Sequence, residues 1–190
     1  MAPPEQKGVR TLILETPRLS LRCYTSEDFS ALHAILSDPV TMQHYPKPYD
    51  EVGTRRWMDW IFKSYRESGF GLWAVIRRED GAFLGDCGIT MQNIDGQAMP
   101  EIGYHIHRDF WRRGYGGEAA CAVRDWGFTH TDFPALYSYM TQGNTASRAT
   151  AAHMGMRLIH SFHDATYQDM VVYAITRDAW QALKASGDAH

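Results

Sequence analysis

Apolar and polar residues change their spacing several times along the chain, and each change marks an expected element. Residues 11–25 alternate in the manner of a strand. Ser26 is expected to cap a first helix, which Pro39 stops, and Asp50 to cap a second helix that ends near Gly69. The apolar stripe of the first helix comprises Phe29, Leu32, Ile35 and Leu36.

The middle of the chain returns to the alternation of strands. Runs at 70–80 and 82–91 are joined at Glu79-Asp80-Gly81, and Asp95-Gly96 marks a second hairpin that leads into 100–107. A helix is expected from Glu118, a strand at 135–141, a helix between Asn144 and Gly155, and two closing strands. The order is strand, two helices, three strands, helix, strand, helix and two strands. It predicts a mixed α/β sheet in one domain.

Composition narrows the class of protein. A length of 190 residues fits one domain at 11–182, with an N-terminal tail at 1–10 and a C-terminal tail at 183–190. The net charge of -3 argues against nucleic acid or an acidic membrane surface as the partner. Three widely spaced cysteines are typical of reduced thiols, and together with the lack of a signal sequence they predict a cytoplasmic location.

A glycine loop at the start of the Glu118 helix carries the main candidate chemistry. Arg112 and Arg113 stand directly before Gly114, and two more glycines follow. Glycines at a helix N-terminus let backbone N–H groups approach a phosphate, and arginines add charged hydrogen bonds. Gly114, Gly116 and Ala119 also fit a dinucleotide-binding fingerprint, although no carboxylate ends the next strand. A phosphate site, a dinucleotide site and a plain tight turn all remain open from these residues alone.

A wider pattern resembles a known family. "PEIGYHIHRDFWRRGYGGEAACAVRDWGF", followed by "NTASRATAAHMGM", is similar to the GNAT N-acetyltransferases, and most similar to their Rim-like branch. The family's loop motif, Gln/Arg-x-x-Gly-x-Gly/Ala, falls on residues 111–116. Trp111 departs from the general motif but is usual in the Rim-like branch. The likeness spans about residues 11–176 and is strongest at 100–156.

The resemblance implies a fold and a binding mode for acetyl-CoA. The GNAT fold is a mostly antiparallel twisted sheet that is splayed at the cofactor strand and carries helices on both faces. In the family the pyrophosphate lies on the loop's backbone amides, the pantetheine arm pairs with the strand before the loop, and the next helix start touches the cofactor. The corresponding residues here are Arg112, Arg113, Gly114, Tyr115, Gly116, Gly117, His105, Ile106, His107 and Asn144.

The resemblance also suggests which residues carry the chemistry. Glu101 begins the cofactor strand, where base glutamates lie in several relatives, and it is expected to deprotonate the amine, with a backbone N–H stabilising the oxyanion. The tyrosine that usually protonates the leaving thiolate is replaced by Ala151. Ser147, at the serine of Asn-x-x-Ser, is the expected substitute, and Tyr104 and Tyr167 are alternatives.

The expected activity is therefore transfer of an acetyl group from acetyl-CoA to a protein N-terminus or a small amine, by a monomer or a homodimer. No metal is expected, because His105 and His107 lack a third ligand at convincing spacing. Two other functions stay open: an oxidoreductase that uses the glycine loop for a dinucleotide, and a non-catalytic CoA-binding module.

Overall fold

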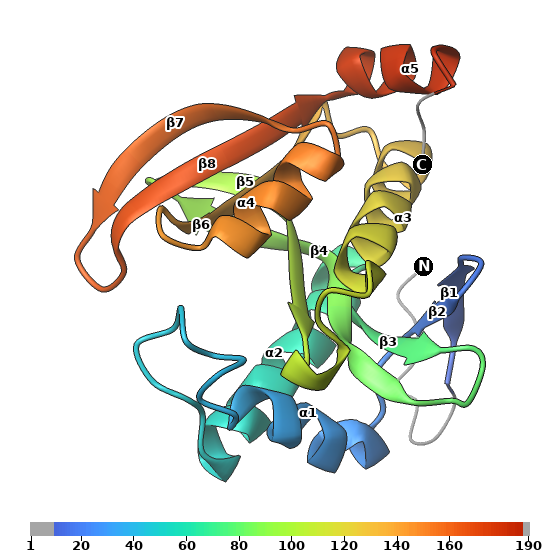
Figure 1. Cartoon of the computed structure of the whole chain (residues 1–190), viewed down its shortest axis with the longest axis vertical. Coiled ribbons are helices and arrows are strands. Elements are labelled where there is room, and N and C mark those ends of the chain that lie inside the picture. The colour runs from blue at the N-terminus through green and yellow to red at the C-terminus, as the bar shows by residue number, and fades with distance from the viewer. Residues whose placement is uncertain (1–9, 188–190) are drawn as a thin grey trace.

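The computed structural model describes residues 10–187 and contains one eight-stranded sheet with helices on both faces (Figure 1). The strands are β1 (Leu12–Glu15), β2 (Leu19–Arg22), β3 (Leu72–Arg77), β4 (Phe83–Ile94), β5 (Gln97–Ile106), β6 (Ala135–Thr141), β7 (Arg157–Asp164) and β8 (Gln168–Thr176). The helices are α1 (Phe29–Leu36), α2 (Glu51–Ser68), α3 (Tyr115–His130), α4 (Thr145–His153) and α5 (Arg177–Ala185).

The sheet has the order β1-β2-β3-β4-β5-β6-β8-β7. All the described neighbours pair antiparallel except β5 and β6, which run parallel and share a single register pair. This confirms the predicted mixed α/β class and the mostly antiparallel sheet. Asp95 and Gly96 both have positive φ (48° and 80°) at the β4–β5 turn, as a type I′ hairpin requires.

The two faces of the sheet are covered by different helices. Adjacent residues of β5 show the division, because Tyr104 reaches α4 whereas the His105 ring packs on Trp57 of α2. On the α3 face, Trp73 packs against Trp126 with ring centroids 4.7 Å apart. Figure 1 shows α1 and α2 together on one side of β4 and β5, and α3 and α4 on the other. The largest fully buried side chains include Trp73, Phe128, Leu19, Leu21, Leu32, Leu36, Met42 and Ile61.

Several predicted helix ends are confirmed because they depend on local chemistry. The Asp50 carboxylate accepts from the Gly53 N–H, and the Asn144 amide oxygen accepts from the Ser147 N–H. Gly155 follows α4 with a φ of 79°, which is the left-handed conformation expected of a C′ glycine.

Four sequence predictions are wrong in detail. Residues 11–25 form the β1–β2 hairpin, since the Thr16 N–H donates to the Leu19 carbonyl and turns the chain. Thr25, rather than Ser26, precedes a 3₁₀ turn at Ser26–Asp28, and Asp28 accepts from its backbone N–H. The third helix, α3, begins at Tyr115, three residues before Glu118.

The fourth correction concerns the C-terminus. The segment after β8 forms α5, which the hydroxyl of Thr176 caps by accepting from the Ala179 N–H. The predicted tail boundary at 183 therefore falls inside a helix that ends at Ala185. The remainder of the two predicted tails, residues 1–9 and 188–190, lies outside the described residues. Between residues 10 and 187, no helix combines the length and apolar character of a membrane span.

Candidate active site

The start of α3 is open to an anion. Its N-cap is Gly114, which has a φ of 79° and no side chain to cap the helix, whereas capping side chains satisfy an N–H at the starts of α2, α4 and α5. The first N–H groups of a helix lack partners within the helix, and the helix dipole makes this end positive. Arg112, with a φ of 59°, is held in a left-handed conformation that is uncommon for a non-glycine residue.

The three loop glycines have different reasons to be glycine. Gly114 has the positive φ. A Cβ on Gly117 would come within 3.0 Å of the His153 ring, so this glycine lets α3 and α4 pack closely. A Cβ on Gly116 would make only an ordinary 3.6 Å contact with Ile106. The fold itself therefore does not require glycine at 116, and its absence of a side chain keeps the helix start accessible to a ligand.

The loop is anchored to the β1–β2 turn. The Arg18 guanidinium donates to the Arg113 carbonyl (2.8 Å) and to the Glu118 carboxylate (2.6 Å). Arg18 also lies over the ring of Tyr115, which is buried, and this contact helps to fix the first residue of α3. The side chains of Arg112 and Arg113 are exposed beside the open helix end. The loop thus has a fixed backbone and two cations at its mouth.

Strands β5 and β6 part immediately beyond their single register pair, Glu101 with Tyr137. The Ser138 hydroxyl donates to the Ile102 carbonyl at 2.8 Å, and no β5 residue after Glu101 has a register partner on β6. This is the splay that the family resemblance implied. The His107 N–H donates to Leu84 of β4, so the alternation of the ladder turns the backbone of Ile106 toward the gap.

At the edge of the gap, the backbone groups of the three predicted strand residues are not equivalent. Those of His105 and His107 face β4, and the Ile106 carbonyl accepts from the Trp111 indole N–H at 2.6 Å. The Ile106 N–H remains directed to the gap. The sequence could not reveal this difference, because the three residues share one strand and only the ladder distinguishes them.

Glu101 sits at the point where the strands part, on the α2 face of the sheet. Its carboxylate accepts a long hydrogen bond from the Thr90 hydroxyl (3.4 Å). Burial raises the pKa of Glu101 from 4.5 to about 7, although His105 and Thr90 oppose the change. The charge of Glu101 adds to burial in raising the pKa of both Tyr45 and Tyr139. A carboxyl group with this pKa can exchange protons near neutral pH.

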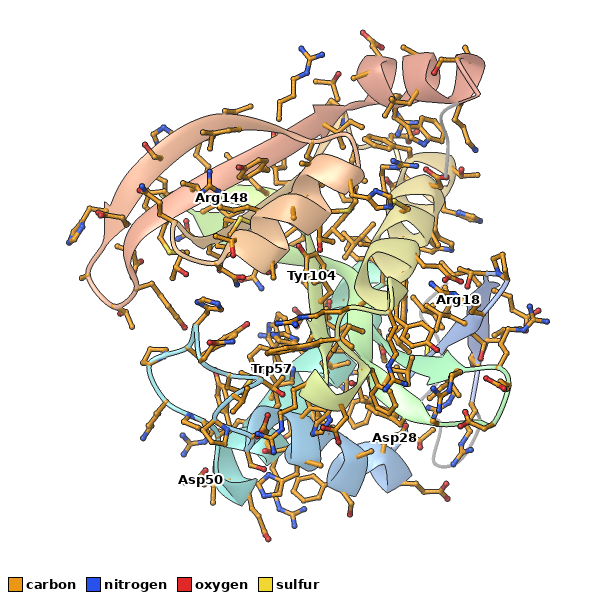
Figure 2. The ribbon with its side chains drawn as sticks, viewed as in Figure 1. Arg18, Asp28, Asp50, Trp57, Tyr104 and Arg148 are labelled. Carbon is orange, nitrogen blue, oxygen red and sulfur yellow. The ribbon has the colours of Figure 1, made fainter. Side chains whose placement is uncertain are left out.

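Asn144 and Ser147 meet at the start of α4, on the other face of β5. The amide oxygen of Asn144 accepts the capping hydrogen bond of α4, so its NH₂ group is left for a ligand. The Tyr104 hydroxyl donates to the Ser147 carbonyl at 3.0 Å, and burial raises the pKa of Tyr104. Figure 2 places Tyr104 near the centre of the molecule beneath α4. Two of the three candidate proton donors, Ser147 and Tyr104, are therefore neighbours, whereas Tyr167 packs against Tyr45 on the opposite face.

A pocket of about 390 Å³ opens on the Glu101 face of the sheet. It is bounded by the loop before α2, the turn between β6 and α4, and the β7–β8 turn. Its lining includes Tyr45, Tyr167 and Asp169. Tyr45 connects the pocket with Glu101 electrostatically, because the charge of Glu101 contributes to the raised pKa of the Tyr45 hydroxyl.

Comparison with known proteins identifies this arrangement. Residues 18–157 match the family model described as "Acetyltransferase (GNAT) domain". The chain belongs to the GNAT acetyltransferase family. The glycine loop, the splayed β5–β6 pair and Glu101 all fall inside the matched residues, whereas Tyr167 and Asp169 of the pocket lie beyond them.

Curated relatives and solved structures agree with the GNAT assignment. The chain is 38% identical over 144 residues to the uncharacterized protein YkkB of Bacillus subtilis, covering 75% of this chain and 84% of the relative. An acetyltransferase from Agrobacterium tumefaciens has a TM-score of 0.75 at 29% identity and covers 85% and 92% of the two chains. RimL, the ribosomal L7/L12 alpha-N-protein acetyltransferase in complex with coenzyme A, shares the fold with a TM-score of 0.74 at 18% identity, covering 88% and 99%.

The structure brings two residues to the candidate site that the sequence did not single out, since both bond to His105. Tyr45 comes from a loop with no readable pattern, and Asp86 looks like an ordinary strand residue. A signal did exist for His105, because its alternation with Glu101 placed both side chains on one face of β5. Within residues 10–187, no group of three or more His, Cys, Asp or Glu side chains could hold a metal ion.

Proposed function

We propose that the protein transfers an acetyl group from acetyl-CoA to a primary amine, by direct attack within a ternary complex. The observation that carries this proposal is Glu101, whose pKa is raised to about 7 at the point where β5 and β6 part. An amine is mostly protonated at neutral pH and must lose a proton before it can attack. The acceptor is a protein N-terminus or a small-molecule amine.

The donor would bind along the gap and onto the glycine loop. Backbone amides from Arg112 to Gly117 would face the pyrophosphate, and the uncapped start of α3 and the missing side chain at Gly116 fit this role. The Ile106 N–H would serve the pantetheine arm, and the Asn144 NH₂ group would reach the donor from α4.

Three groups would handle protons and charge during transfer. Glu101 would take the ammonium proton through one water molecule. A backbone N–H on β5 would stabilise the oxyanion while the amine nitrogen bonds to the acetyl carbon and the carbon–sulfur bond breaks. Ser147, with Tyr104 beside it, would give a proton to the leaving thiolate and would regain one, through water, from the second proton that the amine nitrogen loses after attack. Because Ala151 is buried and carries no donor, the proton has to come from one of these neighbours or from water.

Assignment to the Rim-like branch is part of the proposal. It is supported by Trp111 before the glycine loop, by Asn144 and Ser147 in the Asn-x-x-Ser pattern, and by the RimL structure among the fold neighbours. In this chain Trp111 holds the Ile106 carbonyl, which gives the tryptophan a structural role at the cofactor strand.

An acetyl-CoA consumption screen tests the function. Peptide N-termini, polyamines, aminoglycosides and amino acids would be offered as acceptors. Coenzyme A at about 100 times its Kd should also stabilise the fold by about 2.7 kcal/mol. Tighter binding of a dinucleotide than of coenzyme A would favour the oxidoreductase alternative. Coenzyme A binding without turnover on any amine would favour a non-catalytic module.

A further inference from the structure

A chain of hydrogen bonds runs from the buried sheet to the wall of the 390 Å³ pocket. It begins at Asp86 on β4, whose side chain is 1% exposed. Asp86 accepts from the Tyr24 hydroxyl at 3.1 Å and lies 2.8 Å from Nδ1 of His105. On the other side of the ring, Nε2 of His105 lies 2.7 Å from the hydroxyl of Tyr45.

The carboxylate determines the direction of every bond in this chain. An ionised carboxylate can only accept hydrogen bonds, so Nδ1 of His105 must carry a hydrogen. In the neutral imidazole the other nitrogen, Nε2, then has a lone pair and can only accept. Tyr45 must therefore donate its hydroxyl hydrogen to His105. The phenolic oxygen of Tyr45 has only lone pairs left for any further partner.

The ring of Tyr45 is held in place, just as the direction of its hydrogen bond is determined. Its ring makes edge contacts with Tyr49, Trp57 and Tyr167, with centroids 6.3, 6.4 and 6.3 Å away. These contacts come from three separate parts of the chain and leave the ring little freedom to turn. Tyr45 lines the pocket, and its bond to His105 holds the hydroxyl oxygen at a defined place.

The other residues that line the pocket also favour an acceptor with a positive charge over one with a negative charge. They include no lysine or arginine among the described residues, and burial lowers the pKa of His44, which favours the uncharged ring. Asp169, whose carboxylate lies 3.2 Å from Nδ1 of His163, adds a carboxylate at the rim, and the charge of Glu101 also acts on Tyr45. A carboxylate on the acceptor would find no lysine or arginine among the described lining residues, and Arg148 beside them is engaged with the Gln142 carbonyl at 3.2 Å.

We propose that Asp86 and His105 hold Tyr45 as a hydrogen-bond acceptor for the incoming amine, so that the pocket selects cationic amines that lack a carboxylate. The inference rests on the proposed function, because it concerns the acceptor side of the same site. Tyr45 contacts the acceptor and determines specificity, whereas Asp86 and His105 act through it as positioning residues.

Protonation of His105 reverses this polarity. With hydrogens on both nitrogens, His105 donates to the Tyr45 oxygen, and the Tyr45 hydroxyl then points a hydrogen at the pocket. Burial opposes the charge on His105, but Asp86 on β4 and Glu101 on β5 outweigh it and raise its pKa. Trp57 of α2 and Tyr45 complete its surroundings without a formal charge. Acceptor KM should therefore rise as the pH falls through this raised pKa.

The first test reads the hydrogen positions without any substrate. Long-range ¹H–¹⁵N NMR of the full-length protein at pH 8.5 should find His105 with its hydrogen on Nδ1, and loss of one ring signal in His105→Gln identifies the residue. A hydrogen on Nε2 instead would overturn the inference, because Tyr45 would then face the pocket as a donor.

The second test compares two acceptors that differ at one end, 1,4-diaminobutane and 4-aminobutanoate. The wild type should prefer the diamine by at least about 100-fold in kcat/KM. Tyr45→Phe should raise the diamine KM about tenfold, which corresponds to one hydrogen bond with a charged group, and leave acetyl-CoA affinity within about twofold. Tyr49→Phe, which alters a neighbouring ring outside the hydrogen-bond chain, is the matched control. Equal use of both acceptors, or an unchanged KM in Tyr45→Phe, would overturn the inference.

Calorimetry with 1,4-diaminobutane separates this inference from the proposed function. Weaker binding to Tyr45→Phe than to the wild type would support the inference even if no amine were turned over, a result that would refute the acetyltransferase proposal alone. Turnover of other amines, together with equal diamine binding by the two proteins, would refute the inference and leave the acetyltransferase proposal standing.

Discussion

Replacing Glu101 by Gln should remove the proposed general base while keeping the shape of the side chain. Such a base contributes roughly 10²- to 10⁴-fold to the rate. Because its pKa is about 7, Glu101 is ionised in about one molecule in ten at pH 6 and about nine in ten at pH 8. The ratio of wild-type to variant kcat/KM should therefore rise about tenfold between pH 6 and 8 and then level off. Taking this ratio cancels the titration of the amine itself.

Glu101→Gln should lower the rate, but it should raise the free energy of unfolding at alkaline pH. The folded-state pKa of Glu101 lies above the unfolded value, so between pH 4.5 and about 7 the unfolded chain loses this proton while the folded protein keeps it. A stability penalty builds up over this range and is complete above about pH 7. At about 1.4 kcal/mol per pH unit, the interval from 4.5 to about 7 gives about 3 kcal/mol as an upper limit. Partial exposure of the side chain reduces this to about 1–2 kcal/mol. Glu101→Gln should gain that stability over the wild type at pH 8 and lose the gain at pH 4.

Initial rates from pH 5.5 to 9 and urea unfolding at pH 4 and 8 measure the two effects. Glu67→Gln, which removes an exposed carboxylate on α2, serves as the matched control and should change neither profile. A rate ratio that stays flat across pH 7, together with equal stability at both pH values, would refute both the base role and the burial argument.

Three further substitutions address the donor side of the site. Gly116→Val should fold, because a Cβ at this position makes only an ordinary contact with Ile106, yet it should lose coenzyme A binding in calorimetry; tight binding would place the pyrophosphate elsewhere. Ser147→Ala should slow single-turnover transfer roughly 10²-fold with donor affinity within a few fold, and a loss in Tyr104→Phe alone would move the acid role to the tyrosine. Asn144→Ala should lower the free energy of unfolding by about 1 kcal/mol through loss of the α4 cap and also weaken coenzyme A binding; a change in stability alone would limit Asn144 to capping.

The sequence predicted features that depend on neighbours in the chain. Asp50 and Asn144 were found as caps because an N-cap bonds a backbone N–H three residues later. The open helix start at Gly114 was likewise visible as a local pattern. Helix α5 was missed, although Thr176 caps it, because its buried contact is a single tryptophan, Trp180, on a short segment.

Features that depend on residues far apart could not be predicted. The pKa of Glu101 comes from burial that arises only when β4, β5 and the loop before α2 meet. Tyr45 and His105 are 60 residues apart, and nothing in either segment indicates that their side chains bond. The splay itself entered only through the family resemblance, since strand spacing does not say where two parallel neighbours separate.

The separation of β5 from β6 also interrupts the backbone ladder of the sheet, so the half-sheets β1–β5 and β6–β8 can open locally as separate units. Beyond Glu101 and Tyr137, side chains join the two units: Ser138 donates to the Ile102 carbonyl (2.8 Å), Tyr104 to the Ser147 carbonyl (3.0 Å) and Arg177 to the Phe128 carbonyl (2.6 Å). Amides in β5 and in β6 should thus exchange with solvent through independent openings. A donor held between the facing edges would join the units, so its binding should slow exchange in both half-sheets together, including in β8, which lies a strand away from the gap.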